Sequence, residues 1–492
     1  MITVSNTKHW LIEQATRYPN DKTIKTEQDF ISYQQFLEEC NLTANYLQEN
    51  KVKENDHVGI LFTHSYKIFI IINALWFIGA IPVPLNKRKT VNEIENEIHL
   101  ADIKFLIIDD SLKSQFASLN FPNVLIMNTI MKHGPQNQNF IINNSEPCLP
   151  AGRFIIHNSA LIMFTSGSTG NPKAVVHTFQ SLYESALGLD SFAELSPNDI
   201  WLASLPFYHI GGFMILVRSL IAGSSVVFPA SPKFEDINQA IKQSNPTYIS
   251  LVSTTLQDFL NHNIKPNKNL KYVFLGGGPS QTELITEAVK KSWPIVKVYG
   301  STETCSMITA LHPDYIKSKP DSAGKPIGEN KIKITNKSQN ELGEIAVSSK
   351  SLLKEYYNDR ETTNTKLQNG WYHTGDNGWM DDEGFLYIES RRDDLIISGG
   401  ENISSYEVEL IIRKLPLVKD VLVFGLQDNT WGQIVCAAIV SETISEDEIK
   451  YFLKEKMAAY KIPKRFFIVD EIPRNEMGKA NRTELLKLLK LS

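Results

Sequence analysis

The sequence predicts an α/β protein with a large N-terminal body and a small α+β C-terminal domain. Three observations support this prediction. Apolar, β-rich runs alternate with amphipathic stretches along most of the chain, which is typical of βα layers around buried, largely parallel sheets. Glycine-rich turns directly follow some of the apolar runs. Near residue 390, a compact charged junction separates these layers from a shorter unit with a different pattern.

The first strands and helices are expected between residues 57 and 108. A strand over His57–Phe62 precedes a helix over Lys67–Phe77, and Ile103–Ile108 is expected to form another strand. The run Ile68–Leu85 approaches the length of a membrane span, but an asparagine, a glycine and two prolines interrupt it. We therefore expect a buried helix that runs into a short strand rather than a membrane span.

The middle of the chain repeats the same alternation. The expected elements are strands at Ala160–Phe164, Leu202–Leu205, Ser225–Phe228, Tyr248–Val252 and Lys271–Leu275, and helices at Phe213–Ala222 and Phe234–Ser244. The last of these strands ends in Gly276-Gly277-Gly278-Pro279. Glycines directly after a buried strand let the backbone approach a ligand closely. This turn is therefore a candidate ligand-binding segment.

The charged segment 390–394 is the predicted junction between two domains. The residues after it have the size of a small domain. Its expected elements are helices at Ser405–Lys414 and Ser445–Met457, and strands at Val418–Leu426, Ile434–Val440 and Phe466–Val469. We place the boundary at 390/391, so that residues 1–390 form the body and residues 391–492 form the C-terminal domain.

Composition excludes several classes of protein. The 50 Lys+Arg and 55 Asp+Glu residues leave a net charge of −5, which provides no basic excess for nucleic acid. The cysteines Cys40, Cys148, Cys305 and Cys436 lie far apart, without the spacing of a metal site or a disulfide framework. The polar first ten residues do not predict secretion. We expect a cytoplasmic protein with small-molecule ligands and no integral membrane association; its oligomeric state stays open, with a homo-oligomer as one alternative.

The segment Thr165-Ser166-Gly167-Ser168-Thr169-Gly170-Asn171-Pro172-Lys173 is the most informative part of the chain. It follows an apolar strand and supplies hydroxyls, freed backbone amides and an ammonium group, all of which donate hydrogen bonds to phosphate oxygens. It is not a Walker A loop, because a proline precedes the lysine and an alanine follows it. The segment predicts a triphosphate-binding loop, with a flexible connection as the alternative.

This segment resembles the signature of the adenylate-forming superfamily, which includes acyl-CoA synthetases, luciferases and the adenylation domains of peptide synthetases. The other motifs of that superfamily follow in order: Tyr299-Gly300-Ser301-Thr302-Glu303, Trp371-Tyr372-His373-Thr374-Gly375-Asp376, Arg391 with Asp393, Gly399-Gly400-Glu401-Asn402, and Pro473-Arg474-Asn475-Glu476-Met477-Gly478-Lys479. One departure is Ser390, where many relatives have glycine. The resemblance spans nearly the whole chain and implies layered βαβ subdomains, a β-barrel-like subdomain and a mobile C-terminal lid.

The resemblance also implies ATP, Mg²⁺ and coenzyme A as ligands. The residues expected to contact ATP are Thr165, Ser166, Gly167, Ser168, Thr169, Gly170, Lys173, Gly277, Gly278, Pro279, Tyr299, Gly300, Thr302, Asp376, Arg391 and Lys479. Glu303 is the expected Mg²⁺ ligand, with a solvated loop charge as the alternative. Asp376 would accept hydrogen bonds from the ribose hydroxyls, or it is only a turn residue. Tyr299 would stack on adenine, or it is only a buried tyrosine.

Lys479 is the expected catalytic residue, together with Thr302 and Glu303. The implied reaction has two half-reactions: a carboxylate attacks the α-phosphorus of ATP, and a thiol then displaces AMP from the acyl-adenylate. Lys479 would neutralise charge in the first, and loss of such a donor costs on the order of 10²- to 10³-fold in rate. A surface lysine is the alternative. Asp393 is the expected hinge between the two half-reactions, and Gly399 and Gly400 would line the tunnel of the thiol.

The thiol acceptor is expected to be coenzyme A. Only residues 480–492 follow Lys479, whereas adenylation domains that use a carrier protein are usually followed by that carrier. Luciferase-type oxidation is a further alternative that the motifs leave open.

The acid is predicted from residues 206–223, which contain His209 and a strongly apolar helix with Arg218 inside it. A buried guanidinium needs an anion nearby. That anion is either a structural Asp or Glu, or a second carboxylate on the substrate. His209 would border the acyl pocket, or it is a buried structural histidine, and Gly277, Ser301 and Thr302 would lie at the other edge.

The pattern around His209 narrows the resemblance. Three features look most like those of bacterial o-succinylbenzoate–CoA ligases of menaquinone synthesis. They are the motif P-x-x-H-x-x-G followed by Arg218, the turn Gly276–Pro279, and the segment Ser322–Pro326. The substrate of these ligases is an aromatic keto dicarboxylate, whose second carboxylate could pair with Arg218. The alternatives are a synthetase for fatty, benzoic or cinnamic-type acids, favoured if Arg218 faced a protein carboxylate, and a catalytically silent nucleotide-binding relative.

Overall fold

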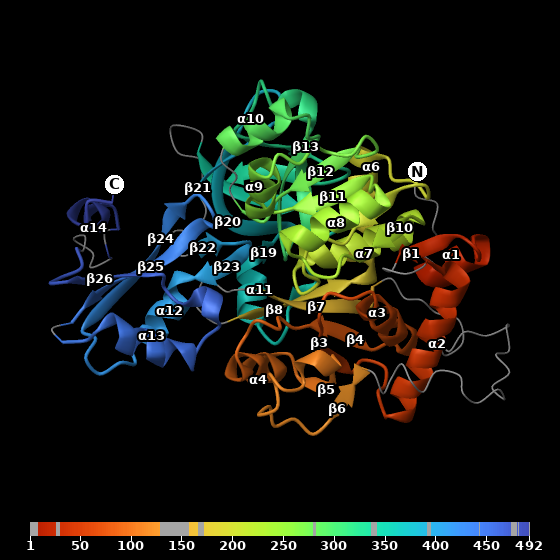
Figure 1. Cartoon of the computed structure of the whole chain (residues 1–492), viewed down its shortest axis with the longest axis horizontal. Coiled ribbons are helices and arrows are strands. Elements are labelled where there is room, and N and C mark those ends of the chain that lie inside the picture. Colours follow the sequence, from red (N-terminus) through yellow and green to blue (C-terminus); the bar gives the residue numbers. More distant parts are fainter. Residues whose placement is uncertain are drawn as a thin grey trace.

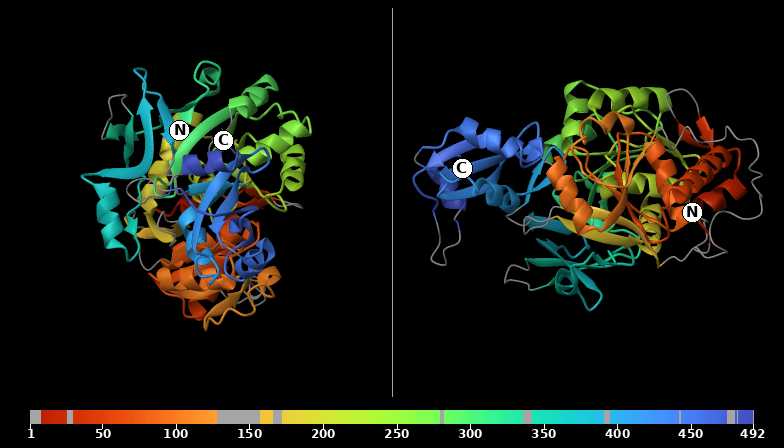
Figure 2. Two further views of the ribbon diagram at one scale, coloured as in Figure 1. Left: turned by 90° about the vertical axis from the view of Figure 1, so that its left-hand side faces the viewer. Right: turned by 90° about the horizontal axis from the view of Figure 1, so that it is seen from below.

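The protein consists of a large body and a smaller C-terminal domain that projects from one end of it (Figures 1 and 2). This computed structural model describes residues 8–25, 30–127, 157–165, 172–278, 282–335, 342–390, 395–441, 443–473, 480 and 482–491. The mixed α/β architecture with two parts of unequal size confirms the predicted fold class. The predicted boundary at 390/391 adjoins a segment, 391–394, that lies outside the described residues, so its position stays a prediction.

A 14-stranded sheet forms the centre of the body. Its first half contains β1 (Lys22–Lys25), β2 (Phe30–Ser32), β9 (Ile200–Leu202), β10 (Ser225–Val227), β11 (Tyr248–Leu251), β12 (Tyr272–Leu275) and β13 (Ile295–Ser301). From β1 through β10, β9, β11 and β12 to β13, neighbouring strands pair in parallel. Buried strands of this kind carry nearly continuous apolar runs, which explains why the sequence pattern located most of them.

The second half of this sheet is antiparallel. It contains β14 (Ser306–Leu311), β15 (Ser322–Pro326), β16 (Lys331–Thr335), β17 (Gly343–Ser348), β19 (Leu367–Gln368), β20 (Trp371–Met380) and β21 (Leu386–Ser390). The resemblance implied a β-barrel-like subdomain in the body. The antiparallel strands continue the central sheet, because β15 pairs with β14 on one side and with β21 on the other.

Two smaller sheets complete the body. One is parallel, with β3 (His57–Leu61), β4 (Ile81–Pro84), β5 (Ile103–Ile108) and β6 (Val124–Ile126); the other is antiparallel, with β7 (Ser159–Thr165), β8 (Lys173–Thr178) and β18 (Glu355–Tyr356). The apolar run after residue 67 forms the buried helix α3 (Lys67–Ile78) followed by β4, as predicted. Gly79 ends this helix in the left-handed conformation, with φ 79°.

The helices of the body cover the faces of these sheets (Figure 1). Besides α3, the described helices of the body are α1 (Trp10–Arg17), α2 (Tyr33–Glu49), α4 (Val91–Leu100), α6 (Phe179–Ala193), α7 (Ile210–Ala222), α8 (Phe234–Ser244), α9 (Ser253–Asn261), α10 (Thr282–Lys290) and α11 (Arg360–Lys366). Helix α7 starts earlier than predicted because His209 serves as its N-cap residue. In the described parts of the chain, no helix has the length and apolar character needed to cross a bilayer.

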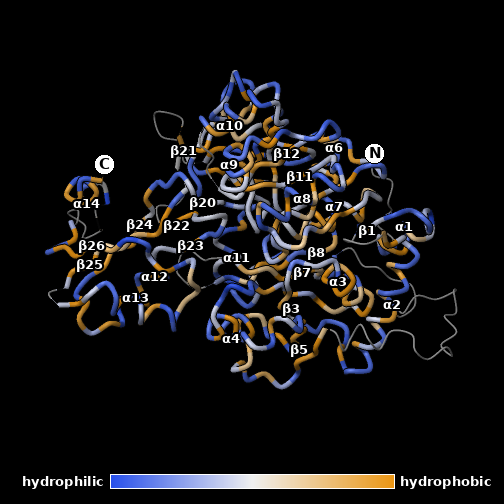
Figure 3. Tube along the Cα trace, in the orientation of Figure 1, coloured by the Kyte–Doolittle hydropathy of each residue, from blue (hydrophilic) through white to orange (hydrophobic). Residues whose placement is uncertain are grey.

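The C-terminal domain has its own sheet and core. Its elements are β22 (Leu395–Ser398), β23 (Glu401–Ser404), α12 (Ser405–Ile412), β24 (Asp420–Asp428), β25 (Gly432–Val440), α13 (Glu446–Lys454), β26 (Arg465–Val469) and α14 (Arg482–Leu488). In both domains, hydrophobic residues gather along the strands and helices that pack into the core (Figure 3). Cys40, Cys305 and Cys436 are buried and unbridged, and Cys148 lies outside the described residues.

Candidate active site

The candidate site lies at the carboxyl ends of the parallel strands β11, β12 and β13. Val252 follows β11, the glycines Gly276–Gly278 follow β12, and β13 ends at Ser301, directly before Thr302 and Glu303. Ligands of open α/β sheets bind at this edge, because loops there are not needed for the sheet itself. The fold thus gathers two of the predicted motifs, the glycine turn and the segment that ends in Thr302 and Glu303, at one edge.

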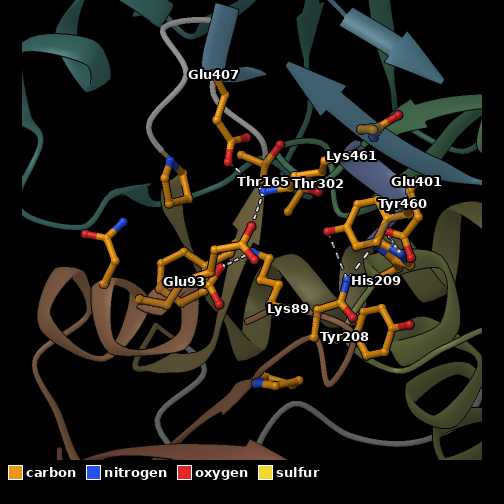
Figure 4. A pocket seen from close by; sticks show the side chains of 17 residues that line it. Lys89, Glu93, Thr165, Tyr208, His209, Thr302, Glu401, Glu407, Tyr460 and Lys461 are labelled. Carbon is orange, nitrogen blue, oxygen red and sulfur yellow. Dashed lines mark hydrogen bonds and ion pairs between the residues drawn. The ribbon is translucent and has the colours of Figure 1, made fainter. Parts of the chain in front are cut away.

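One cavity of about 90 Å³ lies between the body and the C-terminal domain. Thr165, Thr302 and His209, three of the predicted site residues, line it (Figure 4). Glu401, Glu407, Tyr460 and Lys461 reach it from the C-terminal domain (Figure 4). The site is therefore completed by both domains.

The predicted phosphate loop joins two paired strands. Thr165 at the end of β7 is opposite Lys173 at the start of β8, so residues 166–171 connect the ends of a hairpin, and these residues lie outside the described part of the chain. The Lys173 Nζ donates to Thr362 Oγ1 at 3.5 Å and lies 5.4 Å from the centre of the Tyr356 ring. The lysine is thus held at the base of the loop.

Side chains from β8 and β18 hold Thr302 and Glu303. The Tyr356 hydroxyl donates to Glu303 Oε1 at 3.0 Å. The His177 Nε2 lies 2.8 Å from the Thr302 carbonyl oxygen; since a carbonyl only accepts, this nitrogen carries the proton. Burial lowers the pKa of His177 to about 4, so the imidazole is neutral at pH 7. Sequence reasoning missed Tyr356 and His177, because neither stands in a motif that we quoted.

Asp376 lies within β20, at an irregularity in the pairing of β20 with β17, and is held there by its neighbours. The Tyr299 hydroxyl donates to Asp376 Oδ2 at 2.8 Å, and the Asp376 backbone N–H donates to Thr374 Oγ1 at 3.0 Å. Glu344, which the sequence did not single out, accepts from the Gly375 N–H at 2.9 Å. Tyr299 is buried and contacts Asp376 through its hydroxyl, while its stacking on adenine stays a prediction.

A second cavity of about 230 Å³ also lies between the two domains. Gly277, Gly278 and Gly400 line it. A Cβ on Gly278 would lie 2.8 Å from Ile397 Cγ2 of the C-terminal domain, so only glycine allows the domains to approach this closely. Gly400 has φ +83°, which L side chains rarely adopt. Gly399 does not line the cavity itself, but it packs against Trp431, which does.

Arg218 lies on α7 and is 0% exposed. Its Nη2 donates to Ser185 Oγ at 3.2 Å, whereas Nε and Nη1 have no hydrogen-bond partner in the described part of the chain. Within the described residues, no carboxylate pairs with this guanidinium, and burial lowers its pKa to about 10. Ser185 in turn donates to the Cys305 carbonyl oxygen at 2.6 Å, which places Arg218 beside the loop that begins at Ser301. The Ser301 Oγ is likewise buried without a partner.

His209 is in contact with the C-terminal domain. Its Nε2 lies 3.2 Å from Glu401 Oε2, and its ring packs edge-on against Tyr208. Glu401 stood in the quoted glycine motif, but the sequence assigned it no role. Its contact with His209 needs the two domains to be placed side by side, which no local pattern could reveal.

The structure brings together only part of the predicted site. Thr165, Thr302 and His209 share one cavity, and the three glycines share the other. Arg218 and Asp376 line neither of these two cavities. The predicted residues that lie outside the described part of the chain are Ser166, Gly167, Ser168, Thr169, Gly170, Pro279, Arg391, Asp393 and Lys479, and their roles stay predictions.

Comparison with known proteins places these features in a family. The model of the AMP-binding enzyme family matches residues 11–357, and the model of its C-terminal domain matches residues 407–479. A 2-succinylbenzoate–CoA ligase of Bacillus cereus (strain Q1) is 33% identical over 98% of this chain and 98% of its own length. One of Bacillus mycoides is 34% identical over the same shares.

Solved structures of o-succinylbenzoate CoA synthetase from Bacillus subtilis show the same fold. A double mutant bound with its product analogue OSB-NCoA superposes with a TM-score of 0.90, at 32% identity over 97% of this chain and 98% of that one. The complex with the acyl-adenylate OSB-AMP gives 0.73 at 32% identity over 97% of each chain. Because identity and coverage barely differ, the two scores differ through conformation. The predicted resemblance is confirmed: this chain belongs to the AMP-binding enzyme family, and it is similar over almost its whole length to 2-succinylbenzoate–CoA ligases.

Proposed function

We propose that this protein is an ATP-dependent 2-succinylbenzoate–CoA ligase of menaquinone biosynthesis. In the first half-reaction, a carboxylate oxygen of the acid attacks the α-phosphorus of ATP, and the bond to the departing diphosphate breaks. In the second, the sulfur of coenzyme A attacks the acyl carbon, AMP leaves, and the thiol proton passes to solvent. The similarity to ligases of this acid over 98% of the chain supports the assignment.

The observation that carries the choice of acid is the state of Arg218. Its guanidinium is fully buried, and two of its nitrogens have no hydrogen-bond partner among the residues that the structure describes. An unpaired buried cation is costly, so an anion from outside the protein would relieve it. A second carboxylate on the substrate is such an anion, and Ser301 Oγ is a second unpartnered polar atom on the adjoining loop. This observation favours a dicarboxylate over a simple fatty or benzoic acid.

The residues around Thr302 fit MgATP. Glu303 offers a carboxylate whose Oε1 is oriented by Tyr356, and Mg²⁺ is commonly held by one or two carboxylates together with substrate phosphates. Mg²⁺ would neutralise charge on the departing diphosphate. Lys173 and the loop after Thr165 would bind the phosphates, and Asp376 would bind the ribose. Positioning and electrostatics then supply most of the acceleration, because a carboxylate is already a nucleophile.

The second cavity fits the expected path of the thiol. Gly277 and Gly278 line it from the body and Gly400 from the C-terminal domain, so a slender pantetheine arm could pass between the domains. We further propose a cytoplasmic location, which the buried, unbridged Cys40, Cys305 and Cys436 support. Assembly into a homo-oligomer stays open.

Pyrophosphate exchange across a panel of acids tests this function. The panel contains 2-succinylbenzoate, benzoate, a cinnamate and a fatty acid, and thioester formation with coenzyme A is then measured for each acid. We expect exchange and thioester to be fastest with 2-succinylbenzoate. Faster turnover of a monocarboxylic acid would show that the protein is another acyl- or aryl-CoA synthetase.

A further inference from the structure

Charged side chains, two of them buried, join the two domains. They form two sets at the cavity of Figure 4, one around Glu401 and one around Lys461. Neither residue has a role in the nucleotide or acyl sites described above. Both sets join residues that are more than 190 positions apart in the chain.

The first set centres on Glu401, which begins β23 and is 4% exposed. Its Oε1 accepts from Arg88 Nη1 at 2.9 Å, and its Oε2 lies 3.2 Å from His209 Nε2. Both partners belong to the body. Burial alone would raise the pKa of Glu401, but His209 and Arg88 hold it below its ordinary value. The carboxylate is therefore ionised at neutral pH and faces positive or hydrogen-bonding groups of the body.

The second set centres on Lys461, which is 5% exposed. Its Nζ lies 2.6 Å from Glu93 Oε1 of the body and 2.6 Å from Glu407 Oε1 of the C-terminal domain. Figure 4 shows the two carboxylates approaching the ammonium from opposite sides. Burial disfavours the charged ammonium, yet the carboxylates raise the pKa of Lys461 above its ordinary value. This lysine thus bridges the domains.

The contacts that these sets make with Arg88, His209 and Glu93 of the body exist only while the C-terminal domain is docked as it is here. A buried ion pair adds little net stability, but a buried charge that loses its partner is costly. Such pairs therefore favour the one arrangement of the two domains in which both partners meet, and they destabilise arrangements in which a buried charge is left alone. Any movement of β23 away from His209 would break the contacts of Glu401 with the body together.

We propose that Glu401 is a positioning residue for the thioester-forming half-reaction, an assignment that rests on the proposed function. Its carboxylate docks the C-terminal domain in the arrangement in which Gly400 lines the second cavity. This arrangement superposes better on the relative bound with a product analogue than on the relative bound with its acyl-adenylate. His209, predicted to border the acyl pocket, then links that pocket to the position of the domain through Glu401.

The substitution Glu401→Gln in the full-length protein tests this role, because it removes the charge and keeps the shape. We expect single-turnover thioester formation from preformed acyl-adenylate and coenzyme A to slow by about tenfold or more, while pyrophosphate exchange with 2-succinylbenzoate stays within about twofold of the wild type. Retained exchange also shows that the variant is folded. Equal losses in both half-reactions, or an unchanged thioester rate, would overturn the proposal.

Two further variants sharpen the test. Glu455→Gln removes an exposed carboxylate from the same domain and should change neither half-reaction. Arg88→Gln should slow thioester formation as well, and the double variant with Glu401→Gln should lose less than the product of the two separate losses, because both changes break one pair. Multiplying losses would overturn the pairing. If the wild type shows no exchange with 2-succinylbenzoate, the proposed function fails before any variant is compared.

Discussion

Arg218 and Lys461 are both buried cations, but the fold surrounds them differently. Arg218 is 0% exposed and has a serine hydroxyl as its partner, and two of its nitrogens have no partner within the described ranges of the chain. Lys461 is 5% exposed and lies between two carboxylates. Burial lowers the pKa of Arg218 to about 10, whereas Glu407 and Glu93 overcome burial and raise the pKa of Lys461.

Under the proposed function, this difference separates a structural cation, Lys461, from a cation that binds the substrate, Arg218. Where the protein supplies both carboxylates, the charge is satisfied without a ligand and serves to hold the two domains together. Where no carboxylate among the described residues pairs with the cation, as at Arg218, an anion that arrives would satisfy the charge. Removing each cation should therefore have opposite effects on stability, and only Arg218 should affect the acid.

The largest expected effect is that of Lys461→Met on stability. Without the ammonium, Glu93 and Glu407 face each other as buried charges of like sign, which should cost about 3–5 kcal/mol. Calorimetry measures the loss as a lower unfolding temperature or as a separate transition of the C-terminal domain. The exposed Lys454 provides the matched control, Lys454→Met, which should change little. Equal stability of the two variants would contradict a structural role for Lys461.

Arg218→Ala should raise the KM for 2-succinylbenzoate by on the order of 10²-fold, because the second carboxylate loses its partner. The KM for ATP should change far less. Steady-state kinetics with each substrate varied in turn measures both. Arg218→Lys keeps the charge but loses the planar fork of donors, so its KM for 2-succinylbenzoate should lie between those of the wild type and Arg218→Ala. Equal effects on acid and ATP would remove Arg218 from the acyl site.

Arg218→Met should stabilise the ligand-free protein by about 1–2 kcal/mol, because an unpaired buried charge gives way to an apolar side chain of similar size. Thermal unfolding without ligands measures this gain. In the presence of 2-succinylbenzoate and ATP, the wild type should become as stable as the variant, because the acid stabilises only the protein that binds it. A loss of stability in the ligand-free variant would indicate that Arg218 is structural after all.

The smallest expected effect is the acid dependence of the Glu401 pairs. The folded pKa of Glu401 is lowered, so its contribution is fully present above the ordinary carboxyl pKa of 4.5 and is lost as pH falls through the folded value. The difference in stability between wild type and Glu401→Gln should therefore be constant from pH 7 to about 5 and shrink below it by at most about 1.4 kcal/mol per pH unit. Unfolding of both proteins across this range measures it. A difference that grows on acidification would reverse the assigned sign.

Much of the fold could be predicted because its signals are local. An apolar run located β5 and an amphipathic stretch located α8, both with their observed bounds. The interrupted run after Lys67 became a buried helix followed by a strand, as expected. The strand predicted at Leu202–Leu205 is instead β9, Ile200–Leu202. Its position follows from pairing with β10 and β11, which propensity along the chain does not contain. Likewise, the pairing of β15 with both β14 and β21, which joins the antiparallel strands to the central sheet, depends on residues far apart in the chain.

In the candidate site, too, local motifs could be predicted from the sequence, whereas contacts between distant residues could not. Motif residues such as Thr302, Glu303 and Asp376 could be named because their chemistry depends on a short string of residue types. Tyr356, His177 and Glu344 hold those residues in place from other strands, and each is an ordinary residue in its own local sequence. A positioning residue is defined by what it touches, so it becomes visible only when the chain is folded.

The sequence by itself determined the family of this protein, the order of its ATP-binding motifs and the presence of a cation, Arg218, in an apolar helix. Only the tertiary structure decided which buried cation has partners. Arg218 has no carboxylate partner among the described residues, whereas Lys461 has one from each domain. The physical reason is that electrostatic pairing acts over a few ångströms in space, whatever the separation along the chain. Composition counts the charges, but the fold determines which of them meet.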